Sequence, residues 1–242
     1  MIFSVNINQS LYMYIYENPD WPHFIVDLSR TEKLEDKISE LKYFLDGMLM
    51  MISDRNSEIA SFLSDSLKAS WAIEGIDLSD IDIYSSVAKR LGIPYAVKNT
   101  KSYYDGITDV LLDTVTNHCE LSVDRILSWH KKIVDENPSI RKGSFRDGSV
   151  YVVSGKNKNT EIVYEAPPAA SVPTMMNDFI AFINSHKYSD SVMAAVAHFF
   201  FVAVHPFEDG NGRIARIISD YLLSRSSDSL PAAFVSTEIK KK

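Results

Sequence analysis

The chain has 242 residues, 45% of them hydrophobic and 24% charged, so it is long enough to bury a sizeable core. Its formal net charge of −7 disfavours a general binder of nucleic acid or of acidic membranes, because such proteins are usually basic. A single cysteine excludes both an intramolecular disulfide and a cysteine-based metal site.

Helical periodicity dominates the first half of the chain. Residues 1–22 are mixed in polarity and rich in tyrosine, which indicates a short extended or irregular arm. Beyond this arm, apolar residues recur at helical spacing between charged ones. One such run ends at Glu74-Gly75, where glycine suits a helix C-terminus, and the charges and small residues of 79–91 suit an exposed helix. The helices predicted in this half cover residues 30–49, 59–73, 79–91, 109–116 and 122–134.

The pattern changes after Lys142. Two runs of β-branched and aromatic residues, 150–153 and 161–164, are separated by a polar, turn-like segment, which predicts a β-hairpin. Helical patterns then resume over residues 174–184, 192–204 and 214–223. The residues therefore predict a mainly α fold with one small hairpin.

No membrane-spanning segment is predicted. The apolar run 192–204 contains His198 and is shorter than the roughly 20 residues that a spanning helix needs. No basic residue precedes an apolar core at the N-terminus, so a secretory signal is not indicated, and we expect a cytoplasmic location. His198 and His130 lie within helical patterns near apolar faces, which favours hydrogen-bonded structural histidines over ligands.

The stretch between the last two predicted helices, residues 205–216, reads H-P-F-E-D-G-N-G-R-I-A-R. An imidazole, two carboxylates, an amide and two guanidiniums in one short loop have no packing use, which indicates a functional site. His205 comes where the preceding helix must end, because Pro206 disfavours the helical conformation of the residue before it. With an unperturbed pKa near ~6.5, an imidazole can accept a proton at neutral pH.

The rest of this stretch suits an anion. Gly210, Asn211 and Gly212 open the next helix, whose exposed N–H groups and positive end can hold a phosphate. Asp209 is placed to hold Mg²⁺ against phosphate oxygens, whereas we expect Glu208 to face water. Arg213 and Arg216 are spaced i, i+3 and can reach the same anion. A Gly-Asn-Gly turn and a surface arginine pair are each common, but the combination indicates nucleotidyl or phosphoryl transfer.

With every defined position filled, these twelve residues match the signature H-P-F-x-[DE]-G-N-G-R-x-x-R, and the chain strongly resembles the Fic (Fido) family. The resemblance implies a helical Fic core with a β-hairpin flap over the active site. Residues 14–28, with E-N-P-D-W-P-H-F, look like the N-terminal domain that often precedes Fic in bacterial proteins. We therefore expect an N-terminal Fic-associated region at 1–95 and a Fic core at 96–242. The further helices that usually follow such a core are expected to be absent.

The resemblance also implies inhibition from within the chain. Ser70-Trp71-Ala72-Ile73-Glu74-Gly75 fits the family's inhibitory pattern [ST]-x-x-x-E-[GN], and it closes an expected inhibitory helix at about 59–75. In this interpretation the Glu74 carboxylate pairs with Arg216 and takes the guanidinium that should hold the γ-phosphate of ATP. A glutamate at a helix end is more often simply solvated, and only its place upstream of a Fic core favours the inhibitory role.

The activity implied is transfer of AMP from ATP to a Ser, Thr or Tyr hydroxyl of a target protein. His205 would deprotonate the hydroxyl, Asp209 would hold Mg²⁺, and the 210–212 backbone with Asn211 would stabilise the developing charge. Arg213 would bind the β- and γ-phosphates, and Arg216 the γ-phosphate. Two alternatives stay open. One is a hydrolase that removes AMP from modified proteins using Glu74, and the other is a nucleotide-responsive regulatory or interaction protein with little catalysis.

The partners follow from the same resemblance. A flap of this family pairs with an extended segment of the target by strand addition, whereas the hairpin taken alone would be structural decoration. The expected docking residues are Val150, Tyr151, Val152, Val153, Ile162 and Val163. Self-modification and a homodimer are left open, and neither a membrane nor nucleic acid is expected as a partner.

Overall fold

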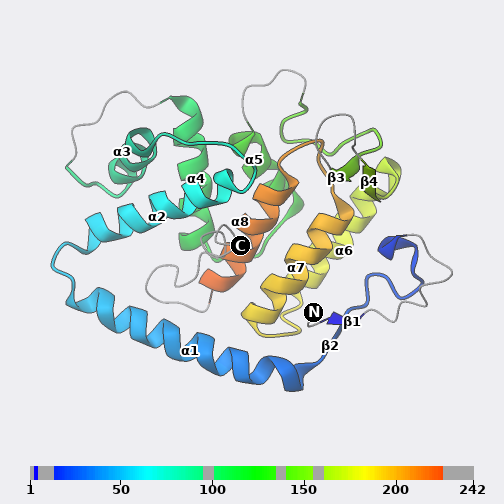
Figure 1. The fold of residues 1–242 in the computed structure, drawn as a ribbon, viewed down its shortest axis with the longest axis horizontal. Coiled ribbons are helices and arrows are strands. Elements are labelled where there is room, and N and C mark those ends of the chain that lie inside the picture. Colours follow the sequence, from blue (N-terminus) through cyan, green and yellow to red (C-terminus); the bar gives the residue numbers. More distant parts are fainter. Residues whose placement is uncertain (1–2, 5–13, 95–100, 135–139, 155–160, 226–242) are drawn as a thin grey trace.

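The computed structural model describes residues 3–4, 14–94, 101–134, 140–154 and 161–225. This part of the chain is mainly helical and carries two small antiparallel strand pairs, as Figure 1 shows. Its α-helices are α1 (Leu28–Met51), α2 (Arg55–Ala72), α3 (Asp80–Arg90), α4 (Ser102–Thr116), α5 (Val123–Ile133), α6 (Val172–Asn184), α7 (Asp190–Val204) and α8 (Asn211–Ser224). The strands are β1 (Phe3–Ser4), β2 (Ile25–Val26), β3 (Tyr151–Ser154) and β4 (Glu161–Glu165), and short 3₁₀ turns cover Ile15–Glu17 and Ala169–Ser171.

Helices α7 and α8 lie side by side at the centre of the molecule (Figure 1). Helix α8 also packs against α4, α5 and α2, and almost all of its residues are buried. A helix that is covered on most sides buries apolar side chains in several directions, as Ile214, Ile217 and Leu223 do. The same helix also buries polar side chains, and its two guanidiniums are exceptional because arginine is rarely fully buried. The buried polar residues of α8 are Asn211, Arg213, Arg216, Ser219, Asp220 and Ser224.

Several helices begin and end where their local sequence predicts. Ser122 caps α5 by accepting a hydrogen bond from the backbone N–H of Arg125, and Ser189 caps α7 in the same way. Helix α2 ends before Gly75, which adopts a left-handed φ of 75°, while the N–H groups of Gly75 and Ile76 bond back into the last turn. These bonds fix the direction in which Glu74 leaves the helix.

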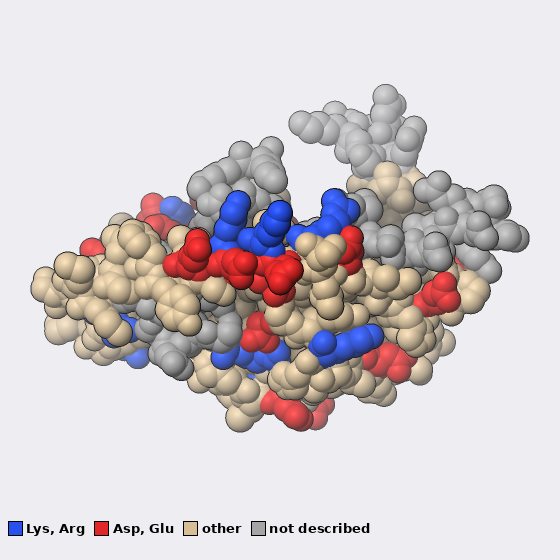
Figure 2. All heavy atoms as spheres, turned by 90° about the horizontal axis from the view of Figure 1, so that it is seen from below, with Lys and Arg blue, Asp and Glu red and all other residues tan. Residues whose placement is uncertain are grey.

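The expectation that residues 79–91 form an exposed helix was wrong in part. Helix α3 is not an exposed helix, because Ile83, Val87 and Ala88 are fully buried against its neighbours. Helix α1 has the predicted helical conformation, and its Leu34, Leu41 and Met48 are about half exposed. Figure 2, a view from below, shows acidic and basic side chains next to each other, without a large area of one sign on the described part of this face. Helix α4 also begins at Ser102, earlier than expected.

The predicted hairpin is formed by β3 and β4, which pair antiparallel with an irregularity after Val152. Strand β4 is fastened to the core by Tyr164, whose hydroxyl donates to the carbonyl of Ala203 in α7 at 2.5 Å. The rings of Tyr14 and Tyr16 pack edge-on against Tyr164, so the N-terminal arm supports the base of the hairpin. Within the described residues, we find no helix that combines the length and hydropathy of a membrane span.

Candidate active site

The loop between α7 and α8 is held in one shape by its own residues. His205 ends α7 in a left-handed conformation (φ 50°, ψ 59°), and Gly210 precedes α8 with φ 78°. The Asn211 side chain accepts from Phe207 N at 2.9 Å and donates to Phe207 O at 2.8 Å. Because Gly210 has no side chain to cap α8, the first N–H groups of this helix remain suited to an anion. Asn211 therefore closes the loop, and its expected role towards developing charge stays a prediction.

His205 is partly buried at the start of this loop. Its Nδ1 lies 3.2 Å from the carbonyl oxygen of Val202, which can only accept, so Nδ1 carries the hydrogen and Nε2 the lone pair. Burial lowers the pKa of His205 below 6.5, and the nearby Arg146 guanidinium acts in the same direction. The imidazole is therefore neutral at physiological pH, as a general base must be.

His130 contacts this loop, and no sequence pattern predicts the contact. His130 is fully buried in α5 and stacks on Phe207 with ring centroids 3.8 Å apart. Its Nδ1 accepts from Gly143 N at 3.0 Å, so Nε2 donates to the carbonyl of Asp209 at 3.1 Å. Burial lowers the pKa of His130 to about 4. His130 is a hydrogen-bonded structural histidine, as expected, but no spacing in the sequence links it to residues 207–209.

Arg146 is a second residue that sequence reasoning did not single out. Its buried guanidinium donates to four backbone carbonyls, at 2.7 Å to His205, 2.6 Å to Pro167, 2.9 Å to Gly148 and 3.4 Å to Val204. The backbone N–H of Arg146 also donates to Pro206 O at 3.0 Å. Arg146 thus ties the loop of His205 to the segments that flank the hairpin. A lone arginine between turn residues gives no sequence signal for this role.

Glu74, at the end of α2, contacts both arginines of α8. Its Oε1 lies 2.7 Å from Arg216 Nη2, and its Oε2 lies 2.8 Å from Arg213 Nε. The second contact is an ion pair without hydrogen-bond alignment, since Arg213 Nε has no hydrogen-bond partner among the described residues. The expected contact with Arg216 is therefore present, and the contact with Arg213 was not anticipated. Both guanidiniums are almost fully buried, so each charge interacts strongly with this carboxylate.

Ser70 strengthens the link between α2 and α8. Arg216 Nε donates to Ser70 Oγ at 2.8 Å, and Arg216 Nη2 donates to Ser70 O at 2.9 Å. Gly212 leaves the room that Glu74 needs, because a Cβ at residue 212 would lie 2.7 Å from Glu74 Oε1. The structure therefore brings Ser70, Glu74, Gly212 and Arg216 together, while Gly75 shapes the turn that follows Glu74.

Asp209 projects from the same loop and its side chain is about half exposed. Its Oδ2 accepts from Arg213 Nη2 at 2.8 Å. Among the described residues no cluster of three metal-ligating side chains occurs. A single exposed carboxylate nevertheless fits Mg²⁺ in a phosphate site, where one or two carboxylates and the substrate phosphates share the ion. Glu208 is exposed, as expected, and its Oε2 also accepts from Arg141 N at 3.1 Å.

The six residues expected to dock a target lie on or next to β3 and β4. Their apolar members differ in exposure, because Tyr151, Val153, Ile162 and Val163 are about half exposed, whereas Val152 is less so. The turn at 155–160 lies outside the described residues. In chemical terms the site offers a neutral base, a helix N-terminus, two guanidiniums and one exposed carboxylate, with a second carboxylate bound to both guanidiniums.

Two family models match this chain. Residues 120–223 match the Fic/DOC family, and residues 14–93 match a domain of unknown function, DUF4172. The site residues 205–216 lie within the Fic/DOC match, and Glu74 lies within the DUF4172 match.

Curated relatives and solved structures agree with the Fic/DOC match. The protein adenylyltransferase fic-1 of Caenorhabditis elegans is 31% identical over 112 residues, which are 45% of this chain and 20% of the relative. The protein adenylyltransferase Fic of Aedes aegypti is 25% identical over 208 residues, 83% of this chain and 39% of the relative. The chain thus spans only a minor part of the curated relatives it matches.

A Fic family protein from Desulfovibrio desulfuricans G20 superposes with a TM-score of 0.61 at 22% identity, covering 86% of this chain and 62% of the other. The solved part of Fic-1 from C. elegans, residues 134–508, gives a TM-score of 0.57 at 19% identity and covers 88% and 62%. The fold is therefore the Fic fold, as expected.

Proposed function

We propose that this protein, which carries a Fic/DOC domain, transfers AMP from ATP to a hydroxyl of a protein and is inhibited by its own Glu74. The observation that carries the proposal is the placement of one carboxylate on both arginines of the motif, at 2.7 and 2.8 Å. The names of the relatives, protein adenylyltransferases, support the reaction type. ATP and a protein hydroxyl are the substrates that follow.

Each residue of the loop has its own role in the proposed reaction. Nε2 of His205, which carries a lone pair, accepts the proton of the target hydroxyl. The hydroxyl oxygen then forms a bond to the α-phosphorus, while the bond from this phosphorus to the bridging oxygen breaks and pyrophosphate leaves with that electron pair. The N–H groups at the start of α8 and the Arg213 guanidinium stabilise the charge on the phosphates. Mg²⁺, held by Asp209 and phosphate oxygens, would add a positive charge there.

In this proposal, Glu74 inhibits the reaction by competing with the phosphates of ATP for the positive charge of the arginines. A γ-phosphate and the Glu74 carboxylate both require the guanidinium of Arg216, and both carry negative charge. Because Glu74 also contacts Arg213, a nucleotide must displace this carboxylate from both arginines or bind with its phosphates misplaced. The proposal therefore assigns residues 1–95 a regulatory part and residues 96–242 the catalytic part, with a boundary at 95–96 that lies outside the described residues.

The hairpin is proposed to dock the target. Strand addition needs an exposed edge with apolar side chains on its faces, and the half-exposed Tyr151, Val153, Ile162 and Val163 support this role. Tyr164 and Arg146 connect the hairpin and its flanks to the backbone next to His205. A segment paired with the hairpin would thus be held at a fixed distance from the base.

The reaction is tested with ATP labelled on either the α- or the γ-phosphate. Glu74→Gly protein is incubated with each nucleotide and a cell lysate, and labelled proteins are separated. We expect label from α-³²P-ATP only, and we expect Glu74→Gly combined with His205→Ala to give none. Label from γ-³²P-ATP would overturn AMP transfer in favour of phosphorylation. Release of AMP from modified protein by the wild type, lost in Glu74→Gly, would instead support the hydrolase.

A further inference from the structure

A chain of hydrogen bonds leads from the end of α2 towards the active-site arginines. Trp71 is buried in the last turn of α2, three residues before Glu74, and its indole Nε1 donates to the Tyr103 hydroxyl at 2.7 Å. Tyr103, in α4, in turn donates to the carbonyl of Ile133 at 3.3 Å. One hydroxyl therefore connects three helices, α2, α4 and α5.

This series of hydrogen bonds ends at Ile133 O, an atom that also binds Arg213 of the active site. Ile133 O accepts from Arg213 Nη1 at 3.2 Å, so Tyr103 and Arg213 share one carbonyl. The Arg213 guanidinium also lies 5.9 Å from the centre of the Trp71 ring, within the range of a cation–π contact. Trp71 and Arg213 are thus fixed relative to each other by Tyr103 and Ile133. This spacing is the one that Glu74 needs to reach Arg213 and Arg216.

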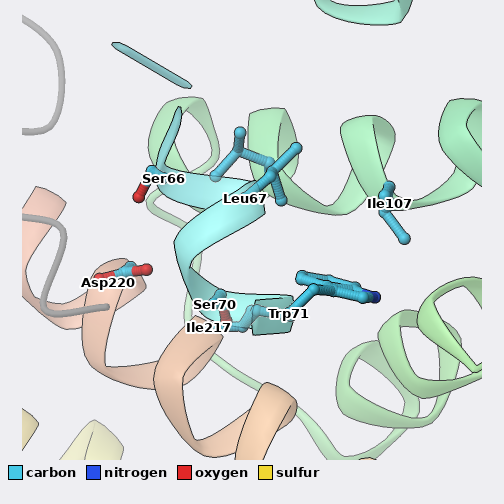
Figure 3. Close-up of a pocket in the computed structure, with 8 residues that line it drawn as sticks. Ser66, Leu67, Ser70, Trp71, Ile107, Ile217 and Asp220 are labelled. Atoms are coloured by element: carbon cyan, nitrogen blue, oxygen red, sulfur yellow. The ribbon is translucent and has the colours of Figure 1, made fainter. Parts of the chain in front are cut away.

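Trp71 is fully buried between helices. Figure 3 shows it among residues of α2, α4 and α8 that line a small pocket and include Ser70, Ile107 and Ile217. The indole nitrogen lies at the far end of the ring from Ser66 and Asp220 (Figure 3), and its hydrogen bond to Tyr103 fixes the direction of the ring within this packing.

We propose that Tyr103 is a positioning residue for inhibition: its hydroxyl holds the end of α2 so that Glu74 stays on the two arginines. This inference rests on the proposed inhibitory role of Glu74 and adds a residue outside both the motif and α2. A buried indole N–H without an acceptor is costly, so removal of the hydroxyl favours states in which the end of α2 has moved. In those states Glu74 leaves Arg213 and Arg216 accessible to phosphate.

The test compares Tyr103→Phe with Tyr104→Phe. Tyr104 is the neighbouring tyrosine, and its hydroxyl accepts from Ser79 N at the start of α3, so its loss leaves Trp71 untouched. We expect Tyr103→Phe to raise self-labelling from α-³²P-ATP by about threefold to tenfold, the effect of one lost hydrogen bond. Amide hydrogen exchange of residues 70–76 should become faster in the same variant. Tyr104→Phe should change neither measurement.

Two further variants separate this inference from the proposed function. In a Glu74→Gly background, Tyr103→Phe should have no additional effect on labelling, because the carboxylate that it positions is gone. If Glu74→Gly raises labelling and Tyr103→Phe does not, the role of Tyr103 is overturned and inhibition by Glu74 stands. If Glu74→Gly leaves self-labelling unchanged, inhibition by Glu74 is overturned. Hydrogen exchange then decides whether Tyr103 holds the end of α2. Unchanged exchange at 70–76 in Tyr103→Phe would show that Tyr103 does not hold α2.

Discussion

Glu74 Oε1 lies 2.7 Å from Arg216 Nη2, although 142 positions separate the two residues in the sequence. The other oxygen of the carboxylate lies equally close to Arg213, so one acid faces both guanidiniums. A contact between segments so distant is made by the fold, through the approach of the end of α2 to the start of α8. The local helix end at Gly75 only sets the direction in which Glu74 leaves α2.

Replacing Glu74 by glutamine tests whether the charge or the size of this side chain blocks the nucleotide. Glu74→Gln keeps the shape of the side chain but removes the negative charge that, in the proposed function, competes with phosphate for Arg213 and Arg216. We expect self-labelling to rise at least about tenfold, which corresponds to 1.4 kcal/mol, and the KM for ATP to fall. Asp77→Asn, in the exposed loop after α2, is the matched control and should leave both quantities unchanged. A glutamine variant as inactive as the wild type would mean that bulk, not charge, blocks the nucleotide.

The acidic side of the pH profile should report His205. Because burial lowers the pKa of His205, the imidazole stays neutral below pH 6.5 and loses its basic form only as pH falls through this lowered pKa. In a Glu74→Gly background we expect kcat/KM to be level from pH 8 to 6.5 and to fall at more acidic pH. A decline that already begins above pH 7 would contradict a neutral, buried base.

His130 should make folding sensitive to acid. Its folded-state pKa of about 4 lies below the ordinary 6.5, so the unfolded chain binds a proton that the folded chain excludes. This contribution to stability is complete above pH 6.5 and is lost as pH falls towards 4. From the two pKa values we expect a loss of about 2 kcal/mol in the free energy of unfolding between pH 7 and 5.

The variant His130→Phe isolates the contribution of His130 to the pH dependence of stability. His130→Phe can keep the stacking on Phe207 but leaves Gly143 N and Asp209 O unpaired, so it should be less stable at pH 7 by roughly 2 kcal/mol. Its stability should then depend less on pH, as measured by urea unfolding at both values. His118→Phe, at an exposed position, serves as control. An unchanged pH dependence in His130→Phe would assign the effect to other groups.

The proposed metal role of Asp209 predicts a difference between Asp209 and its neighbour Glu208. In a Glu74→Gly background, Asp209→Asn should lower AMP transfer by at least about tenfold and shift the Mg²⁺ requirement to higher concentration. Glu208→Gln changes an exposed acid that accepts from Arg141 N, and its effect should stay within about threefold. Transfer rates measured across a Mg²⁺ titration, with chelator as the zero point, test both. Equal losses in the two variants would argue against a specific ligand.

Local patterns predicted the elements and the loop of the site, because these depend on nearby residues. Gly75 as a helix terminator and residues 205–210 as the loop before α8 follow from interactions within a few positions. His130 and Arg146 could not be found in this way. They reach the loop from 59 to 79 positions away, and the burial that creates their role exists only in the folded chain.

Exposure was the other quantity that local patterns did not settle. The charges and small residues of α3 suggested an exposed helix, yet one face of this helix is covered by α2 and α4. The apolar residues of α1 recur at helical spacing, yet Leu34 and Leu41 are about half exposed. A hydrophobic period shows which face of a helix could be covered. It does not show whether a neighbour is there to cover it.

Gly212 limits which substitutions could relieve the proposed inhibition during evolution. A single added methyl group at this position would intrude on the acid from α2 and also on Arg216, whose Nη1 would lie 3.1 Å away. In the proposed function, the inhibitory contact of Glu74 with Arg216 thus depends on the absence of a side chain at residue 212. Substitutions that relieve the restraint are therefore expected at Glu74 or along α2, where the machinery of α8 is left intact, and not at this glycine.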